Sequence, residues 1–306
     1  MDIHATDFIT YLTCARKFKY GIVDRLIAID YEEPEYFTFG KAGHLWLKEM
    51  HNSWDVEKSL AQIVDPTMRD SHELFARLYK EQYEAKDRRR FQIASQENSN
   101  VFEFEGVRLH YTIDSLMLGV TNFLLGYGIM DHKFYASFPD SDMLKRDFQL
   151  SFYWWASQRL GLDIQWCILN VIRKSIPEMP MPLKSGGLTR AKKSLAETEY
   201  SLYMQSIQLL GLNPKDYSEE LQYLKERGSN TFKRYIIRRS KEQIEEFEYI
   251  LVQMIRDIKS RDYFIPSPSK ECLFCPYEFL CHMQNTRGDV ELAQRKLFRV
   301  KTSAER

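Results

Sequence analysis

The chain has 306 residues, and its 43 Lys and Arg residues balance its 43 Asp and Glu residues. This length predicts one large domain, or one domain with an insertion, and 44% apolar residues are enough for a sizeable core. The balanced charge excludes a global field that attracts nucleic acid, so any such binding must come from a local basic patch.

No targeting or membrane segment is predicted. Residues 1–7 are polar and acidic, unlike a secretory signal peptide. The longest apolar stretch, Phe123 to Met130, contains glycine and is far too short to span a membrane. We therefore expect a cytoplasmic protein with no membrane partner. In a reducing compartment, clustered thiols are metal ligands more often than disulfides.

The first half of the chain predicts helices and then strands. Residues 6–13 show a short helical pattern with Thr6 as N-cap, and a basic aromatic stretch follows over residues 16–20. The next elements are expected, in chain order, as helices over 41–50 and 70–90, strands over 101–118 and 122–134, a helix over 145–160 and an apolar strand over 163–173. Strands followed by a helix and a further strand predict a mixed α/β core.

The second half predicts a helical addition to this core. Residues 175–188 are rich in Pro, Gly and Met and predict a loop, whereas the segment 189–260 is largely helical. Ser240 and Gln243 match a capping box at the start of the last long helix. The expected organisation is a single domain with a core over about 1–175, a helical insertion over about 176–262 and a cysteine-containing segment over 263–306 that packs on the N-terminus.

Four cysteines mark the two ends of the chain. Cys272, Cys275 and Cys281 form a C-x2-C-x5-C run, and Cys14 is available as a fourth ligand. Thiolate sets of this kind suit zinc or an iron–sulfur cluster, and three cysteines within ten residues make unrelated core cysteines a poor explanation. If Cys14 joins the set, a metal site joins the two ends of the chain. Cys167 lies in an apolar strand pattern and is predicted to be a core residue.

Two acidic residues lie inside apolar strand patterns, where an unpaired carboxylate is costly. Asp131 and Lys133 are two apart on one strand, so they project from the same face. Asp114 joins them if the two strands are neighbours. Two carboxylates then make a hard-oxygen site for Mg²⁺ or Mn²⁺, which polarises a phosphate oxygen and lowers the pKa of water, while Lys133 orients that water. Ordinary solvent-facing acids beside a lysine are an equal alternative on these residues alone.

Three further polar residues stand on predicted helices. His44 lies near the start of an amphipathic helix, and Gln149 and Tyr153 are four residues apart, so they share one helical face. Taken singly, each of these residues is explained equally well by a structural role, because a lone helical His or a polar edge on a buried helix is usually structural.

Taken in order, these residues resemble the PD-(D/E)XK nuclease superfamily, in particular its RecB-like branch with a four-cysteine iron–sulfur cluster. That branch includes the nuclease domain of AddB, the CRISPR-associated adaptation exonucleases and many phage-encoded nucleases. The stretch from Thr10 to Tyr20 is similar to the opening motif of the family, with Ala15 where proline is usual. Gly40 to Glu49 resembles the G-x-x-x-H-x-x-L-E motif, with Lys48 in place of its Glu, or with Glu49 shifted by one.

The remaining motifs extend the resemblance over most of the chain. Asp114 falls on the I-D motif, Asp131 to Lys133 on the D-x-K motif, and Gln149 to Tyr153 on the Q-L-x-x-Y motif. Cys14 and the C-x2-C-x5-C run match the cluster ligands of the branch. No single match is decisive, but the ordered series is specific.

The resemblance implies a restriction-endonuclease-like core, with a mixed central sheet flanked by helices, a helical insertion and an iron–sulfur clasp that joins the N- and C-terminal segments. It implies metal-dependent hydrolysis of DNA, and we expect a phage-type exonuclease that favours single-stranded DNA or a duplex end. Its role is expected in repair, recombination or replication, with DNA and proteins of these processes as partners. The implied cofactors are a [4Fe–4S] cluster and Mg²⁺ or Mn²⁺.

The resemblance also assigns roles to individual residues. The implied catalytic residues are His44, Asp114, Asp131, Lys133, Gln149 and Tyr153. The implied Mg²⁺ or Mn²⁺ ligands are His44, Asp114, Asp131 and the carbonyl of His132. The implied cluster ligands are Cys14, Cys272, Cys275 and Cys281. We expect seven basic residues to contact DNA phosphates: Arg16, Lys17, Lys192, Lys193, Arg234, Arg238 and Arg239. The alternative for each is an ordinary solvated surface charge.

Two alternatives stay open. The protein could be a catalytically idle DNA-binding or adaptor subunit of a larger nuclease complex, although its D-x-K and Q-x-x-x-Y positions are all filled. The four cysteines could hold zinc in place of an iron–sulfur cluster.

Overall fold

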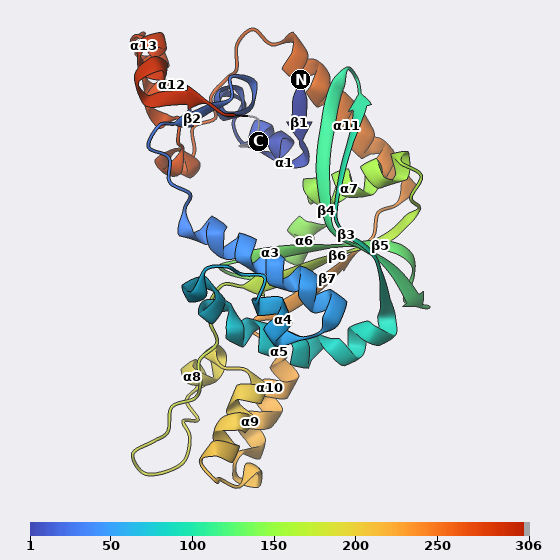
Figure 1. Cartoon of the computed structure of the whole chain (residues 1–306), viewed down its shortest axis with the longest axis vertical. Helices are drawn as coiled ribbons and strands as arrows, with labels where there is room; N and C mark the ends of the chain where they lie inside the picture. The colour runs from blue at the N-terminus through green and yellow to red at the C-terminus, as the bar shows by residue number, and fades with distance from the viewer. Residues whose placement is uncertain (303–306) are drawn as a thin grey trace.

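A six-stranded mixed sheet lies at the centre of the structure, a computed structural model that describes residues 1–302 (Figure 1). Its strands are β1 (Asp2–His4), β3 (Phe91–Phe104), β4 (Val107–Thr121), β5 (Leu124–Tyr135), β6 (Ile164–Arg173) and β7 (Phe232–Ile237). They follow the order β1-β4-β5-β6-β7, and β3 also pairs with β4. The β1–β4 and β5–β6 pairs are parallel and the others antiparallel, which confirms the predicted mixed sheet.

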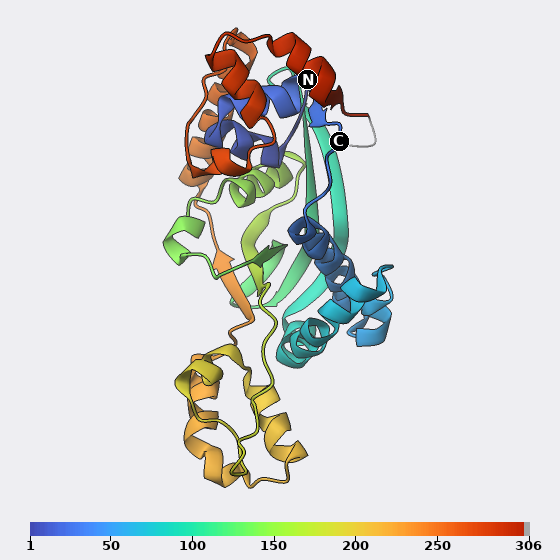
Figure 2. The ribbon, with the colours of Figure 1, turned by 90° about the vertical axis from the view of Figure 1, so that its left-hand side faces the viewer.

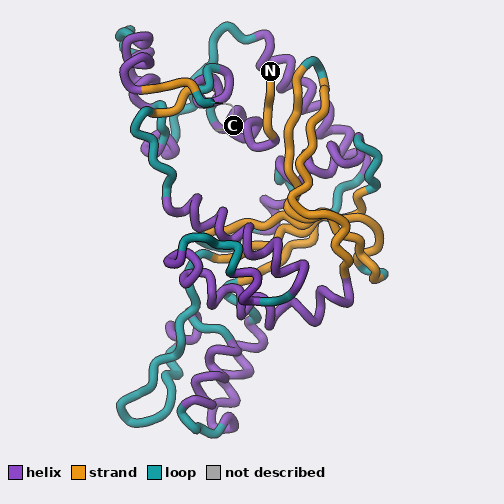
Figure 3. The backbone as a smooth tube through the Cα atoms, viewed as in Figure 1, coloured by secondary structure: helices purple, strands orange, loops and turns teal. Residues whose placement is uncertain are grey.

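Helices cover both faces of this sheet (Figure 3). On one face lie α3 (Glu35–Ser53), α4 (Val56–Leu60) and α5 (Pro66–Arg90), and on the other α1 (Ala5–Thr13), α7 (Phe148–Arg159) and α11 (Lys241–Ser260). Leu169 and Val171 of β6 pack in the core with α7 and α11, whereas Ile172 packs in the core with α3 and α5. This alternation follows from the period of two in a strand, and it explains why most residues of β6 are apolar, with Asn170 as a buried polar exception.

β3 and β4 form a long hairpin, and the polar first part of β3 is not apparent from the sequence. One strand over 101–118 was predicted, but β3 and β4 are separate strands that meet at a tight turn where Glu105 and Gly106 both have positive φ. The first part of β3, with residues such as Gln96, Asn98 and Asn100, lacks the apolar alternation that marks a strand. It is a strand because it pairs along almost the whole of β4.

A small helical lobe projects from the body of the molecule (Figure 2). It contains α8 (Lys192–Glu197), α9 (Tyr200–Leu209), η2 (Pro214–Tyr217) and α10 (Ser218–Arg227). The lobe has a core of its own, formed by Leu188, Leu195, Tyr203, Ile207, Tyr217 and Leu224. The expected insertion over 176–262 is therefore too long, because β7 pairs with β6 and α11 packs on α7. The predicted capping box at Ser240 and Gln243 is present at the start of α11.

The two ends of the chain meet in a third region (Figure 1). It comprises α2 (Ala15–Phe18), the π-helix η1 (Lys19–Val23), β2 (Leu26–Ala28), η3 (Lys270–Phe274), α12 (Glu278–Asn285), α13 (Val290–Leu297) and β8 (Phe298–Val300). β2 and β8 pair antiparallel, with Leu26 opposite Val300. Tyr20, Tyr277 and Leu280 belong to the apolar cluster that joins the two ends of the chain. The short helix α6 (Ser141–Leu144) leads into α7. Across residues 1–302, no helix has the length and apolar character that crossing a membrane requires.

Candidate functional site

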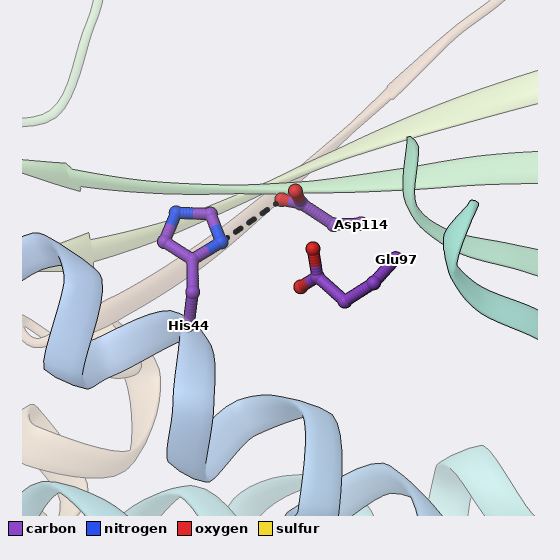
Figure 4. Close-up of side chains that lie close together, drawn as sticks. All are labelled: His44, Glu97 and Asp114. Carbon is purple, nitrogen blue, oxygen red and sulfur yellow. Dashed lines mark ion pairs between the residues drawn. The ribbon is translucent and has the colours of Figure 1, made fainter. Parts of the chain in front are cut away.

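Three side chains from three different elements converge beside the central sheet (Figure 4). His44 comes from α3, Glu97 from β3 and Asp114 from β4, and one possible ligand atom of each lies within 4.8 Å of the others. His44 Nδ1 is 3.3 Å from Asp114 Oδ2. An imidazole nitrogen and two carboxylates are a donor set that a divalent cation such as Mn²⁺ or Mg²⁺ accepts.

Glu97 reaches this group through strand register. Gln96 pairs with Ser115 and Asn98 pairs with Ile113, so Glu97 stands opposite Asp114. Its φ of 49° lies in the left-handed region, which is uncommon for a residue with a Cβ and is often found at functional sites. Glu97 is not recognisable as a site residue from the sequence, because only its pairing with β4 brings it to Asp114.

His44 reaches the site because α3 packs closely on β5. Gly43 makes this approach possible, since a Cβ at that position would lie 2.0 Å from Phe134 Cζ. Gln96 of β3 also donates a hydrogen bond to the carbonyl of Lys48, which ties β3 to α3. Lys48 and Glu49, the two residues that could correspond to the Glu of the family motif, are not among the converging ligand residues. Glu49 instead forms an ion pair with Lys58 at 2.7 Å.

Asp131 and Lys133 form an ion pair on β5, with the aspartate buried and the lysine partly exposed, and their spacing places both on one face as predicted. Lys133 Nζ lies 2.8 Å from Asp131 Oδ2, and Asp131 is only 1% exposed. Burial raises the pKa of Asp131, and the Asp114 carboxylate raises this pKa further against the opposing effect of Lys133. Burial alone would lower the pKa of Lys133, but the carboxylates of Asp131 and Asp114 more than offset it, so the pKa is raised and the ammonium stays charged.

Asp114 joins the two halves of the site. Its Oδ2 accepts a hydrogen bond from the backbone N–H of His132 at 2.7 Å. Burial would raise the pKa of Asp114, but its hydrogen bond to His44 and the nearby positive charges hold the pKa below its usual range. The same interaction with Asp114 raises the pKa of His44, although burial acts against it.

Gln149 and Tyr153 lie on α7 beside the ion pair. Gln149 Nε2 donates to the Tyr153 hydroxyl at 2.6 Å. Burial and the charge of Asp131 raise the pKa of Tyr153, so its hydroxyl keeps its proton. The structure thus brings all six predicted catalytic residues to one region, with Glu97 as an addition.

The basic residues predicted to contact phosphate fall into two groups. Arg16 is 1% exposed and donates to Asn285 Oδ1 at 2.8 Å and to the carbonyl of Phe264. Arg234 makes two hydrogen bonds to the Asp87 carboxylate, at 2.7 and 2.8 Å. The prediction is wrong for these two residues, because their guanidinium groups bind protein partners in the interior. Lys17, Lys192, Lys193, Arg238 and Arg239 are partly or fully exposed.

One cavity of about 210 Å³ is lined by all four cysteines that were predicted to act together, Cys14, Cys272, Cys275 and Cys281. Three of the sulfur atoms accept N–H hydrogen bonds, two from the backbone of Ser267 and Ser269 at 3.5 Å and one from Arg16 at 3.4 Å. No three of these sulfurs lie within 4.8 Å of one another in the described part of the chain, and all are free thiols. A compact tetrahedral set of thiols is therefore not formed. Cys167 is fully buried in β6.

The structure thus combines a mixed sheet flanked by helices with a carboxylate pair and the D-x-K lysine near the centre of the sheet. A family model described as the PD-(D/E)XK nuclease superfamily matches residues 5–282. The chain belongs to this superfamily, which implies a DNA-binding nuclease with Mg²⁺ or Mn²⁺ as its metal. No curated protein sequence matches the chain significantly.

Proposed function

We propose that the protein is a deoxyribonuclease of the RecB-like branch, an exonuclease that favours single-stranded DNA in repair, recombination or replication. One observation carries this proposal. The His44–Asp114 pair and the Asp131–Lys133 pair are joined by the hydrogen bond from His132 N to Asp114, so the two pairs belong to one site. A cytoplasmic location and a phage origin stay predictions.

The donor set fits a divalent cation. His44, Glu97 and Asp114, whose ligand atoms converge, would hold it, and Asp131 and the carbonyl of His132 are proposed as further ligands. When bound, a cation of this kind supplies Lewis-acid activation of the phosphate and of water. Lys133 keeps its proton and so can orient water and stabilise the charge that grows on the phosphate. Tyr153, held by Gln149, offers a neutral hydroxyl at the same place.

DNA contacts are proposed for the accessible basic residues. Arg238 lies over the ring of Phe123 at 5.1 Å, and Phe123 is 64% exposed. An arginine beside an exposed aromatic ring suits a phosphate and its base together, because aromatic faces stack bases of any sequence. Lys17, Lys192, Lys193 and Arg239 are proposed as additional phosphate contacts.

A [4Fe–4S] cluster is proposed for the cysteine cavity. Two properties support it: the cavity is shared by four thiols, and N–H donors point at three of the sulfurs. The proposed role of the cluster is structural, since the cavity lies between the two ends of the chain and away from the carboxylates.

Incubation of the purified protein with Mn²⁺ and end-labelled single-stranded DNA tests the proposal. We expect cleavage that falls by about 10³-fold in Asp131→Ala and in Lys133→Ala, because each removes a charge at the reacting phosphate. Asp163→Ala is the matched control, since Asp163 is an exposed acid just before β6. Cleavage that persists in both site variants rejects this site. DNA binding without cleavage by the wild type would indicate an adaptor subunit. Blocked ends that prevent cleavage would support an exonuclease.

A further inference from the structure

A line of hydrogen bonds crosses three adjacent strands behind the candidate active site. His132 of β5 pairs in register with Asn170 of β6, and Asn170 pairs in register with Arg234 of β7. The Asn170 amide nitrogen lies 2.8 Å from His132 Nδ1, and Arg234 Nε donates to Asn170 Oδ1 at 3.0 Å. His132 and Asn170 are at most 2% exposed, so water does not compete for these bonds.

The direction of each hydrogen bond follows from the chemistry of the side chains. Arginine offers only donors, so the atom of Asn170 that faces Arg234 must be its oxygen. The Asn170 NH₂ group therefore donates to His132 Nδ1, and its second proton goes to the Tyr79 hydroxyl at 3.1 Å. His132 Nδ1 is then an acceptor, and the neutral imidazole carries its proton on Nε2.

Arg234 is itself held in one position. It binds Asp87 through two hydrogen bonds, donates to the Tyr79 hydroxyl at 2.7 Å, and its guanidinium carbon lies 3.7 Å from the centre of the Tyr83 ring. Paired and planar contacts of this kind fix a guanidinium more firmly than a single bond does. Orientation therefore passes from Asp87 through Arg234 and Asn170 to the His132 ring.

We propose that Asn170, oriented by Arg234, is a positioning residue for the strand segment that carries Asp131 and Lys133. Side chains alternate along a strand, so a fixed His132 ring on one face sets the two peptide groups that place Asp131 and Lys133 on the other. The same residue supplies the backbone N–H that holds Asp114 at 2.7 Å. This inference rests on the proposed function, because it assigns the network a role in that same site.

Asn170→Asp tests the role directly, because it keeps the shape and the oxygen that faces Arg234 but replaces the donor to His132 with an acceptor. His132 must then carry a proton on Nδ1. We expect kcat to fall by about tenfold or more and Mn²⁺ affinity to fall similarly, as for other partners that orient ligands, with KM for DNA unchanged. Imidazole ¹⁵N shifts in histidine-labelled protein report which nitrogen of His132 carries the proton. If Asn170 had a purely structural role, a change of this nitrogen would not be accompanied by a change in kcat.

Cys167→Ala is the matched control, since Cys167 is also fully buried on β6 but packs in the opposite core. It should lower stability and leave kcat and Mn²⁺ affinity unchanged. If Asn170→Asp does not fold, Arg234→Lys decides, because it keeps the charge opposite Asp87 and loses the Nε contact with Asn170. Wild-type kcat and Mn²⁺ affinity in the folded variant overturn the inference alone. A wild type that neither binds Mn²⁺ nor cleaves DNA overturns the proposed function and the inference with it.

Discussion

The candidate active site and the cysteine cavity are assembled in different ways. The active site is built from paired strands and one helix packed on them, with Asp131 1% exposed and His132 2% exposed. The cysteine cavity draws on both ends of the chain and on short helices. Leu273 and Phe274, between two of its cysteines, are 81% and 86% exposed. The first site rests on a sheet and a large core, and the second rests on a smaller apolar cluster that includes Tyr20, Tyr277 and Leu280.

This difference predicts how far the folding of each region would depend on a bound metal or cluster. Strand register holds the carboxylates of Asp114 and Asp131 near each other, with His44 beside the first and Lys133 beside the second. The sheet therefore sets the carboxylate site before any cation binds. The cysteine cavity rests on a smaller core, so a cluster bound there would be expected to contribute to folding.

The largest expected effect comes from Cys275→Ala. A cluster that joins Cys14 to the C-terminal cysteines closes a loop of most of the chain, and by analogy with disulfide loops its loss lowers the free energy of unfolding by about 4–5 kcal/mol. The variant should be colourless and unstable, with Mn²⁺ affinity at the carboxylates unchanged. Denaturant unfolding, visible absorbance and a Mn²⁺ titration measure the three properties. A brown variant of full stability would refute the proposal, and Cys167→Ala should keep the colour.

The same contrast explains which features were predictable. The apolar patterns of β5, β6 and α7 set the core of the sheet, and the D-x-K spacing places Asp131 and Lys133 together because strand periodicity is local. The C-x2-C-x5-C spacing predicts that Cys272, Cys275 and Cys281 lie together, and they line one cavity. These features depend on residue types at short spacings, which a sequence displays directly.

Other features depend on partners that are distant in sequence. Arg234 lies in a basic run and was expected on a DNA-binding surface, but its register with Asn170 carries it to Asp87 in the interior. Glu97 stands in a polar strand and comes to the site only because β3 pairs with β4. β7 was hidden for the same reason, since its charged residues lack an apolar alternation and its pairing with β6 decides its structure.

The next largest effect is a pH dependence of stability that arises in the core beside the candidate active site and not in the cysteine region. Burial lowers the pKa of His51 and of His72 to about 4, and both lie in the core between α3 and α5. His51 faces Tyr79, Arg234 and Asp87, and His72 accepts from Trp46. Each imidazole titrates near 6.5 when unfolded, so between pH 6.5 and pH 4 the unfolded chain binds more protons and stability falls with acidification.

The cost at pH 5 is about 2 kcal/mol for each histidine. Denaturant unfolding between pH 7 and pH 5 measures this loss of stability. The free energy of unfolding should change less with pH in His51→Gln, because glutamine cannot titrate. His282→Gln is the control in the cysteine region, because its side chain is exposed, and it should leave this pH dependence unchanged. An equal pH dependence in His51→Gln and in the wild type would contradict the assignment.

The smallest expected effect concerns Glu97, at the edge of the active site. Burial and the Asp114 carboxylate raise the pKa of Glu97, so its charge is unfavourable while no cation is bound. Glu97→Gln should therefore weaken Mn²⁺ binding by about tenfold, equal to about 1.4 kcal/mol, without lowering the stability of the metal-free protein. Isothermal titration with Mn²⁺ and thermal unfolding without it give the two values. Glu103→Gln, an exposed acid on the same strand, should change neither. Unchanged Mn²⁺ affinity in Glu97→Gln would make Glu97 an ordinary solvated acid and confine the site to His44, Asp114 and Asp131. A loss of affinity without a loss of stability would show that strand pairing supplies a ligand the motifs do not contain.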